Sequence, residues 1–188
     1  FPDCLDPDRV MAAALTGMGL YSDAVAPLKR LQERDPDPAT REQLAQALVG
    51  AGLDRDLLDF LAVEAPAGLS PREWNLVVEA EGRLGESAWS LACLGAASGD
   101  ETVPGGLPDG LLTDPPVWGR ISLNLLEAGR LAEGLKAADR AVELDPRNVV
   151  YRNNRVVLLL ELGREEEASR EWEEVLKLDP SLKAKESE

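Results

Sequence analysis

Glycine residues divide the chain at a nearly constant interval. Five of them, separated by 33, 33, 44 and 34 residues, mark that interval: Gly19, Gly52, Gly85, Gly129 and Gly163. One period therefore accounts for the spacing, with an insertion of about ten residues in the longest interval. Near the C-terminus, the tripeptide Leu-Asp-Pro also recurs at an offset of 34 residues, at 144–146 and 178–180. The sequence thus predicts a short array of similar units.

Each of these glycines separates two segments whose apolar residues return at steps of three and four. In the fourth copy, Trp118, Ile121 and Leu125 show this step before the glycine, and Leu135 and Ala138 show it after the glycine. In the first copy, the step before the glycine runs through Met11, Ala12, Leu15 and Met18. This is the period of an α-helix, so each unit is predicted to be a pair of helices. Glycine suits the turn between them because it adopts positive φ without a steric cost.

A helix start signal precedes the first helix of every copy. An Asp, Ser or Asn side chain can accept hydrogen bonds from the first turn, and proline at the first helical position loses no needed donor. Ser70 and Glu73 additionally form the pattern of a capping box. The five signals are Asp6-Pro7, Asp37-Pro38, Ser70-Pro71, Asp114-Pro115 and Asn148.

The pattern resembles the tetratricopeptide repeat (TPR), a helix-turn-helix unit of 34 residues. The resemblance rests on a large early residue, the turn glycine, a small residue in the second helix and a closing Leu-Asp-Pro. In the fourth copy these are Trp118, Gly129, Ala141 and residues 144–146, and in the fifth they are Leu159, Gly163, Ala168 and residues 178–180. The resemblance implies an all-α fold, an αα-hairpin solenoid that forms a right-handed TPR-like superhelix of about five helix pairs.

The resemblance also divides the chain into segments. It is close over 115–180, good over 5–36 and weaker over 38–97, where Glu81 replaces an expected apolar residue. We expect three repeats in 1–97 (5–36, 38–66 and 71–97), two repeats in 115–180 and a polar tail over 181–188. The Gly- and Pro-rich segment 98–114 is either a hinge or a packed loop, and its residues Leu107, Leu111 and Leu112 favour packing.

Composition excludes several classes of function. The formal net charge of −15 disfavours nucleic acid and anionic membrane surfaces as partners. No apolar run approaches the roughly 20 residues that span a bilayer, so membrane insertion is not expected. The chain has no histidine, and no arrangement of residues indicates a catalytic site, a metal site or a cofactor. Cys93 lies in an apolar segment and is expected to be a small buried residue.

The TPR resemblance implies a function in protein–protein interaction. In that family the first helices of the repeats line a concave groove, which binds an extended peptide or a helix of another protein. The corresponding residues of this chain are Arg9, Gln43, Gln46, Arg72, Asn75, Arg83, Arg120, Leu123, Asn153, Asn154 and Val157. Among them, Asn154 aligns with an asparagine that contacts the ligand backbone in peptide-binding members.

Four arginines on this surface leave two interpretations open. Arg9, Arg72, Arg83 and Arg120 face only Glu79 among acidic residues of the projected groove, which would suit an acidic segment of a partner. Alternatively, these arginines pair with neighbouring acidic residues, and surface pairs of that kind are common and weak.

Two alternatives to an adaptor remain at this stage. The chain could be a structural protein that self-associates through the exposed C-terminal repeat, since 181–188 looks too short and polar to cover that repeat. It could also be a regulatory or targeting arm of a larger enzyme. The low cysteine content favours the cytoplasm, and the periplasm would require a leader before Phe1. The excess of arginine over lysine is typical of a GC-rich bacterial genome.

Overall fold

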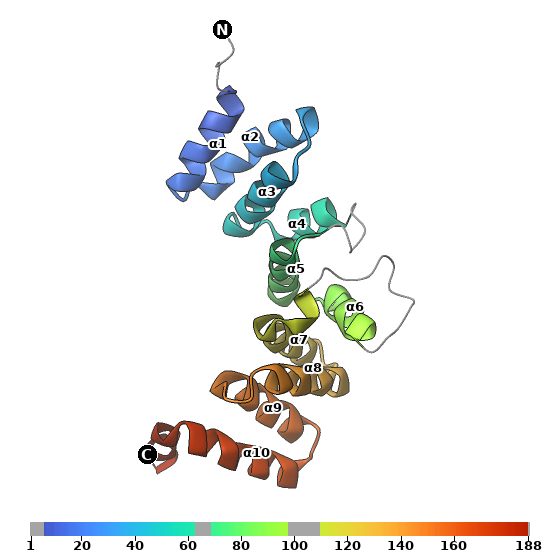
Figure 1. Ribbon diagram of the computed structural model, residues 1–188, viewed down its shortest axis with the longest axis vertical. Helices are drawn as coiled ribbons and strands as arrows, with labels where there is room; N and C mark the ends of the chain where they lie inside the picture. Colours follow the sequence, from blue (N-terminus) through green and yellow to red (C-terminus); the bar gives the residue numbers. More distant parts are fainter. Residues whose placement is uncertain (1–5, 63–68, 98–109, 188) are drawn as a thin grey trace.

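The fold is known from a computed structural model, which describes residues 6–62, 69–97 and 110–187. These residues form ten α-helices in consecutive pairs that stack along the long axis of the molecule (Figure 1). None of the helices in these three ranges has the length and apolar character needed to cross a membrane. The helices are α1 (Pro7–Gly17), α2 (Tyr21–Arg34), α3 (Pro38–Gly50), α4 (Asp54–Leu61), α5 (Pro71–Leu84), α6 (Ala88–Ala97), α7 (Pro115–Glu127), α8 (Leu131–Leu144), α9 (Val149–Glu161) and α10 (Glu165–Leu178).

The predicted glycine turns join the two helices of each pair. All five glycines have φ between 68° and 73°, the left-handed region that other residues rarely occupy. In the fourth pair, the Gly129 amide donates to the Leu126 carbonyl at 3.0 Å and the Arg130 amide donates to the Leu125 carbonyl at 2.7 Å. This bonding satisfies carbonyl groups at the helix end. The predicted helical hairpins are therefore confirmed.

Most of the predicted start signals act as helix caps. The Asp37 carboxylate accepts the amides of Ala39 and Thr40, and the Asn148 side chain accepts those of Val150 and Tyr151. Ser70 and Glu73 form the predicted capping box. Asp114 is the exception, because its side chain makes no capping hydrogen bond. Proline at both 115 and 116 removes amide donors from that first turn.

Two tryptophans fill the core beside the insertion. Trp74 and Trp118 are buried, and Trp74 packs edge-on against Trp89 with ring centroids 5.1 Å apart. The indole Nε1 of Trp118 donates to the Leu112 carbonyl at 3.0 Å, and Leu111 is buried in the same core. The end of the insertion therefore packs against the repeats. Leu107 and the rest of 98–109 lie outside the described residues.

Glu81 replaces an apolar residue because it caps a neighbouring helix. Its buried carboxylate accepts the Trp89 amide at 2.6 Å, the Ser90 amide at 2.9 Å and the Ser90 hydroxyl at 2.8 Å. These amides belong to the first turn of α6, which has few other partners for its orphan donors. Burial raises the pKa of Glu81, while the three hydrogen bonds oppose that rise.

Cys93 is buried and unpaired, in agreement with the sequence interpretation. Burial raises the pKa of its thiol to about 12, so the thiolate is almost absent at neutral pH. Cys4 lies outside the described residues.

The C-terminal repeat is better covered than the sequence suggests. Residues Pro180–Ser187 form the 3₁₀ segment η3 against α10, and Leu182 packs on the C-terminal core that contains Ala168 and Val175. No large apolar side chain of α10 is exposed among the residues described. Leu182 therefore covers part of the C-terminal repeat that the sequence analysis expected 181–188 to leave open.

The turn geometry predicts a specific response to alanine. Gly129→Ala should lower the free energy of unfolding by about 1 kcal/mol, because a Cβ disfavours the left-handed backbone. Gly17→Ala is the matched control, since Gly17 ends α1 without positive φ and has open space around its Cα. That control should be neutral or stabilising by up to about 1 kcal/mol. Urea unfolding followed by circular dichroism measures both, and equal effects would contradict the assigned role of Gly129.

The Glu81 cap predicts a pH-dependent difference between wild type and Glu81→Gln. A carboxyl whose pKa is raised on folding favours the folded state at low pH and loses that contribution as pH rises through its folded pKa. The glutamine variant has no such loss, so its stability relative to wild type should increase from pH 4 to pH 7. Urea unfolding at each pH measures the difference, and Glu161→Gln serves as control because Glu161 is exposed. A difference that shrinks as pH rises would overturn the assignment.

Candidate partner-binding groove

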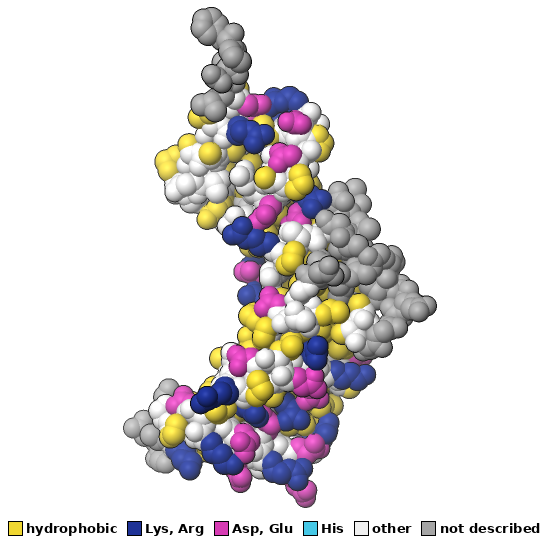
Figure 2. Space-filling view, in the orientation of Figure 1, with side chains coloured by type: hydrophobic (Ala, Val, Ile, Leu, Met, Phe, Trp, Pro, Cys, Tyr) yellow, Lys and Arg dark blue, Asp and Glu magenta, His cyan; other side chains and the backbone are white. Residues whose placement is uncertain are grey.

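The first helices of neighbouring repeats contact one another directly. α3 packs against α5, α5 against α7, and α7 against α9. These helices therefore share one side of the stack, as the TPR resemblance implies. In the space-filling view the outline of the molecule is hollowed on the left at the level of α5 and α7 (Figure 2).

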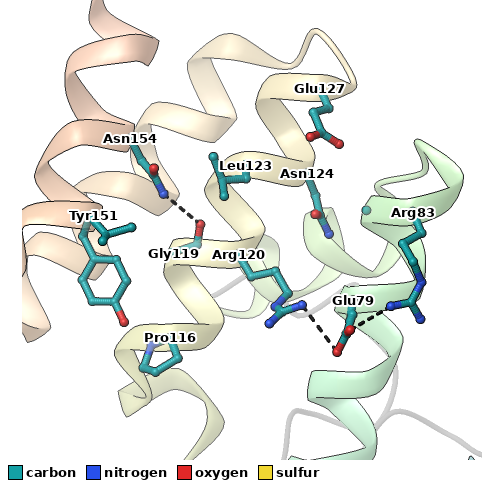
Figure 3. A pocket seen from close by; sticks show the side chains of 12 residues that line it. Glu79, Arg83, Pro116, Gly119, Arg120, Leu123, Asn124, Glu127, Tyr151 and Asn154 are labelled. Carbon is teal, nitrogen blue, oxygen red and sulfur yellow. Dashed lines mark hydrogen bonds and ion pairs between the residues drawn. The ribbon is translucent and has the colours of Figure 1, made fainter. Parts of the chain in front are cut away.

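A cavity of about 620 Å³ lies on this side between α5, α7 and α9 (Figure 3). It is an open groove whose walls come from three successive repeats, so no single repeat could form it. Its lining consists of Glu79, Gly82 and Arg83 from α5, of Pro116, Gly119, Arg120, Leu123, Asn124 and Glu127 from α7, and of Val150, Tyr151 and Asn154 from α9.

Two glycines let the first helices approach closely. A Cβ at Gly119 would lie 2.5 Å from the Tyr151 ring, and a Cβ at Gly82 would lie 2.5 Å from Oδ1 of Asn124. A larger residue at either position would therefore force the Tyr151 or Asn124 side chain to move. The groove floor depends on glycine at the middle of α7 and near the end of α5.

A charged cluster occupies the α5 side of the groove. Glu79 accepts a hydrogen bond from Nη1 of Arg83 at 2.7 Å and pairs with Nη1 of Arg120 at 3.5 Å. Nε of Arg83 also donates to the largely buried Asp54 of α4 at 2.8 Å. These partners raise the pKa of Arg83 above its usual range, mainly through the hydrogen bonds that Arg83 donates to Asp54. Arg83 is thus held by two carboxylates, while Arg120 has a single, longer ion pair within the described part of the chain.

The other two arginines of the predicted surface are also paired. Arg9 lies 3.8 Å from Asp37, and Arg72 donates to Glu42 at 2.6 Å. All four arginines therefore have acidic neighbours, which was the second of the two interpretations drawn from the sequence. Of the two arginines that line the cavity, Arg120 has the longer ion pair, and only Arg9, which lies outside the cavity, has a longer one among the four.

Asn154 is more buried than its predicted role implies. Its Nδ2 donates to the Gly119 carbonyl at 3.3 Å (Figure 3) and also to the Ser122 hydroxyl at 3.4 Å. The amide donor is thus engaged in tying α9 to α7. Among the residues described, nothing donates to its Oδ1, which keeps an acceptor available at the groove.

The structure brings four of the predicted residues together and leaves the others outside the cavity. Arg83, Arg120, Leu123 and Asn154 line it. The remaining predicted residues lie on the first helices but do not line this cavity: Arg9, Gln43, Gln46, Arg72, Asn75, Asn153 and Val157. Asn75, for example, donates to the Pro71 carbonyl of its own helix.

Sequence reasoning missed the residues that shape the groove. Tyr151, Asn124 and Val150 line it, as do Pro116, Glu127 and the two glycines. The available signal was glycine inside a helical pattern, at 82 and 119, since such a glycine has a packing reason when it is retained. Within the described ranges, no group of three His, Cys, Asp or Glu side chains is placed to hold a metal ion.

Comparison with known sequences gives short matches to repeat-containing proteins. No family model matches the chain. The TPR repeat-containing thioredoxin TTL4 of Arabidopsis thaliana is 47% identical over 53 residues, which is 28% of this chain and 8% of that protein. The inactive TPR repeat-containing thioredoxin TTL3 of the same plant is 35% identical over 68 residues, 36% of this chain and 10% of that protein. The matched stretch thus spans no more than a tenth of either relative.

Comparison with solved structures covers nearly the whole chain. A crystal structure of MamA protein superposes with a TM-score of 0.68 at 14% identity, over 95% of this chain and 92% of that one. MamA from Desulfovibrio magneticus RS-1, beginning at its residue 41, gives a TM-score of 0.65 at 17% identity, over 93% and 94% of the two chains. At this identity the likeness shows the fold alone. Given its paired helices, its glycine turns and its short matches to TPR-containing sequences, the chain has the repeat fold of tetratricopeptide repeat proteins.

Proposed function

We propose that this protein is an adaptor that binds a segment of another protein in the groove between α5, α7 and α9. The observation that supports this most is the combination of exposed apolar side chains and a weakly paired guanidinium in one cavity. TPR proteins act in protein–protein interaction generally, and the proposal assigns that role to a specific surface. The proposed activity is binding, and no catalytic step is assigned to the groove.

The apolar part of the groove is suited to a hydrophobic side chain of the partner. Leu123 is 39% exposed and Val150 is 61% exposed, and both line the cavity beside Tyr151. Covering such side chains contributes about 25 cal/mol for each Å² of apolar surface removed from water. If an extended peptide or a helix inserted one apolar residue here, that residue would pack against side chains of both α7 and α9, and this burial would stabilise the complex.

The polar part of the groove favours a carboxylate next to that apolar residue. Arg120 is exposed and pairs with Glu79 at 3.5 Å, whereas Glu79 has a shorter bond to Arg83. A partner carboxylate could therefore engage Arg120 without leaving Glu79 unpaired. Because the chain carries a net charge of −15, the rest of the partner should be neutral or basic.

A longer protein is the second candidate setting for this array. The two Arabidopsis thaliana relatives are named as thioredoxins, and they match this chain over no more than 10% of their own length. In such a setting the groove would recruit partners to an attached domain. A cytoplasmic site of action is part of the proposal and is supported by the low cysteine content.

The groove is tested by a substitution at its apolar floor. Peptides selected from a displayed random library on the wild-type protein should bind Leu123→Asp at least tenfold more weakly, about 1.4 kcal/mol. The reason is that a carboxylate covered by an apolar partner side chain loses its hydration. Isothermal titration calorimetry with the selected peptides measures the change.

A matched control is available on the same chain. Leu53 is also 39% exposed but lies at the turn between α3 and α4, where the third repeat has Glu86 in the equivalent position. Leu53→Asp should bind the selected peptides as wild type does. If both variants bound the peptides equally weakly, or if both bound them as tightly as wild type does, binding in the α5–α7–α9 groove would be contradicted.

A further inference from the structure

The first helix of the stack has an apolar face that nothing in the described structure covers. We define the N-terminal face as Val10, Met11, Ala14 and Met18 of α1 and its C-cap. All four residues are exposed, Met11 by 50% and Met18 by 64% of its surface. Large apolar side chains rarely gather on a free surface without a function.

The positions equivalent to Met11 and Ala14 are mostly interior positions in the other repeats, whereas those equivalent to Val10 and Met18 are mostly at the surface. Met11 lies eight residues before its turn glycine. The residues at the same distance in the second, third and fourth repeats are Leu44, Val77 and Ile121, which are buried, whereas the fifth repeat has the half-buried Arg155 there. Five residues before the glycine, Ala14 corresponds to four buried residues, Ala47, Ala80, Asn124 and Leu158. The first repeat thus has the apolar character of an internal repeat, whereas the end of a solenoid is usually polar.

In the other repeats this face contacts the preceding helical hairpin. Asn124 of α7 donates to the Val78 carbonyl of α5 at 2.7 Å. Leu158 of α9 packs against Gly134 of α8, so closely that a Cβ at Gly134 would lie 2.9 Å from the Leu158 side chain. The structure therefore shows what kind of element fits against such a face. That element is a helix or a helical hairpin with apolar and small side chains.

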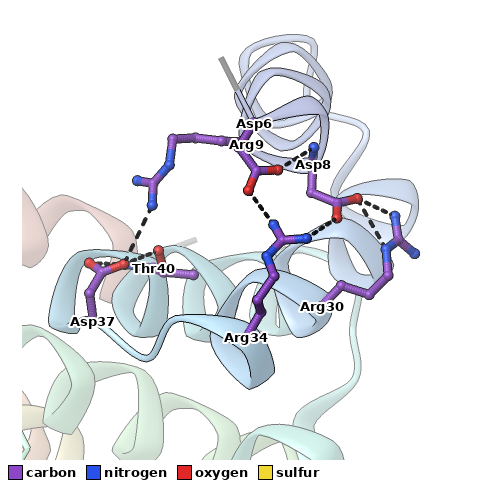
Figure 4. A network of polar contacts seen from close by, with 7 residues as sticks. All are labelled: Asp6, Asp8, Arg9, Arg30, Arg34, Asp37 and Thr40. Atoms are coloured by element: carbon purple, nitrogen blue, oxygen red, sulfur yellow. Dashed lines mark hydrogen bonds and ion pairs between the residues drawn. The ribbon is translucent and has the colours of Figure 1, made fainter. Parts of the chain in front are cut away.

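The charged residues of α1 all point away from the N-terminal face. Asp8 pairs with Arg30 of α2 at 2.5 Å, the capping residue Asp6 pairs with Arg34, and Arg9 lies 3.8 Å from Asp37 (Figure 4). Asp8 and Arg9 are the only charged residues of α1. Their pairing with α2 and the start of α3 leaves the N-terminal face uncharged.

We propose that the N-terminal face binds the same face of a second copy of this chain, so that two molecules associate head to head about a twofold axis. A twofold contact requires a self-complementary patch, and an uncharged row of Val, Met and Ala meets that requirement. Methionine side chains adapt readily to such packing because they are unbranched and flexible.

The distribution of charge favours this pairing over the alternatives within a homodimer. Residues 6–36 have five acidic and four basic side chains, so two N-terminal repeats repel each other little. The C-terminal repeat has its end covered by η3 and exposes Glu165, Glu166, Glu173 and Glu174. A head-to-tail or tail-to-tail contact would involve this C-terminal end, where the apolar core is covered and the exposed acidic side chains would repel the second acidic molecule.

The size of the face predicts a weak dimer. α1 has 11 residues, and a helix of that length extends only about 16 Å. Two such helices with their neighbours cover less than the area of a standard stable interface. Screening by salt should strengthen the contact, because each copy has a net charge of −15.

Sedimentation velocity of the full chain tests the proposal, over about 1 µM to about 1 mM protein. The wild-type weight-average mass should rise from 20.3 kDa toward twice that value, and more steeply in 500 mM than in 50 mM salt. Met11→Glu should remain at the monomer mass at every concentration. Leu160→Glu is the matched control, because Leu160 is 53% exposed on α9 and the charge change is the same.

Each outcome of this experiment decides the proposal. Dimerisation of wild type and Leu160→Glu but not of Met11→Glu supports it. A wild-type mass that stays at 20.3 kDa throughout, or a rise that Met11→Glu retains, overturns it. Loss of the dimer in Leu160→Glu alone would place the contact at α9 and also overturn it. Circular dichroism melts confirm that both variants fold, which is expected because both positions are exposed.

Discussion

The left-handed backbone at five glycines is the constraint on which the rest of this structure depends. Each of these residues reverses the chain between two helices and satisfies the carbonyl groups at the end of the first one. Because all five turns have nearly the same φ, each second helix leaves its turn in nearly the same direction. Residues at equal distances from their glycine therefore occupy equivalent places, and the stack repeats.

Contacts between repeats convert this repetition into a surface with specific chemistry. Gly82 and Gly119 bring α7 and α9 close to the preceding first helix, and the amides of Asn124 and Asn154 donate to its backbone. Ion pairs add further ties, as between Arg41 of α3 and the buried Glu73 of α5, 2.7 Å apart. Most of the arginines in such pairs are neutralised by a neighbouring carboxylate, so the remaining surface charge is acidic. Arg120 differs because its ion pair with Glu79 is long and its guanidinium is exposed.

Features that depend on local sequence were predictable, and features that depend on neighbours were not. The turn glycines and the caps at Asp37 and Ser70 follow from residues within one turn of helix. The cap that Glu81 provides to α6 and the cover that Leu182 gives α10 join separate elements, so no periodic pattern indicates them. For the candidate groove, the sequence predicted the first helices as its lining, and these helices do contact one another along the stack. The extent of the cavity follows from Tyr151 packing on Gly119, a contact between repeats that the sequence pattern does not indicate.

The two proposed surfaces follow from one property of a helical stack. Stacking buries the faces of each first helix that meet its neighbours, while the groove side of α7 keeps exposed side chains. Leu123 is exposed because it lies on that open face of an internal repeat. Met11 is exposed for a different reason, since it lies on a stacking face that no preceding repeat covers in the described structure. Occupying one surface therefore leaves the other accessible, and an adaptor of this kind could hold a partner segment while paired with a second copy.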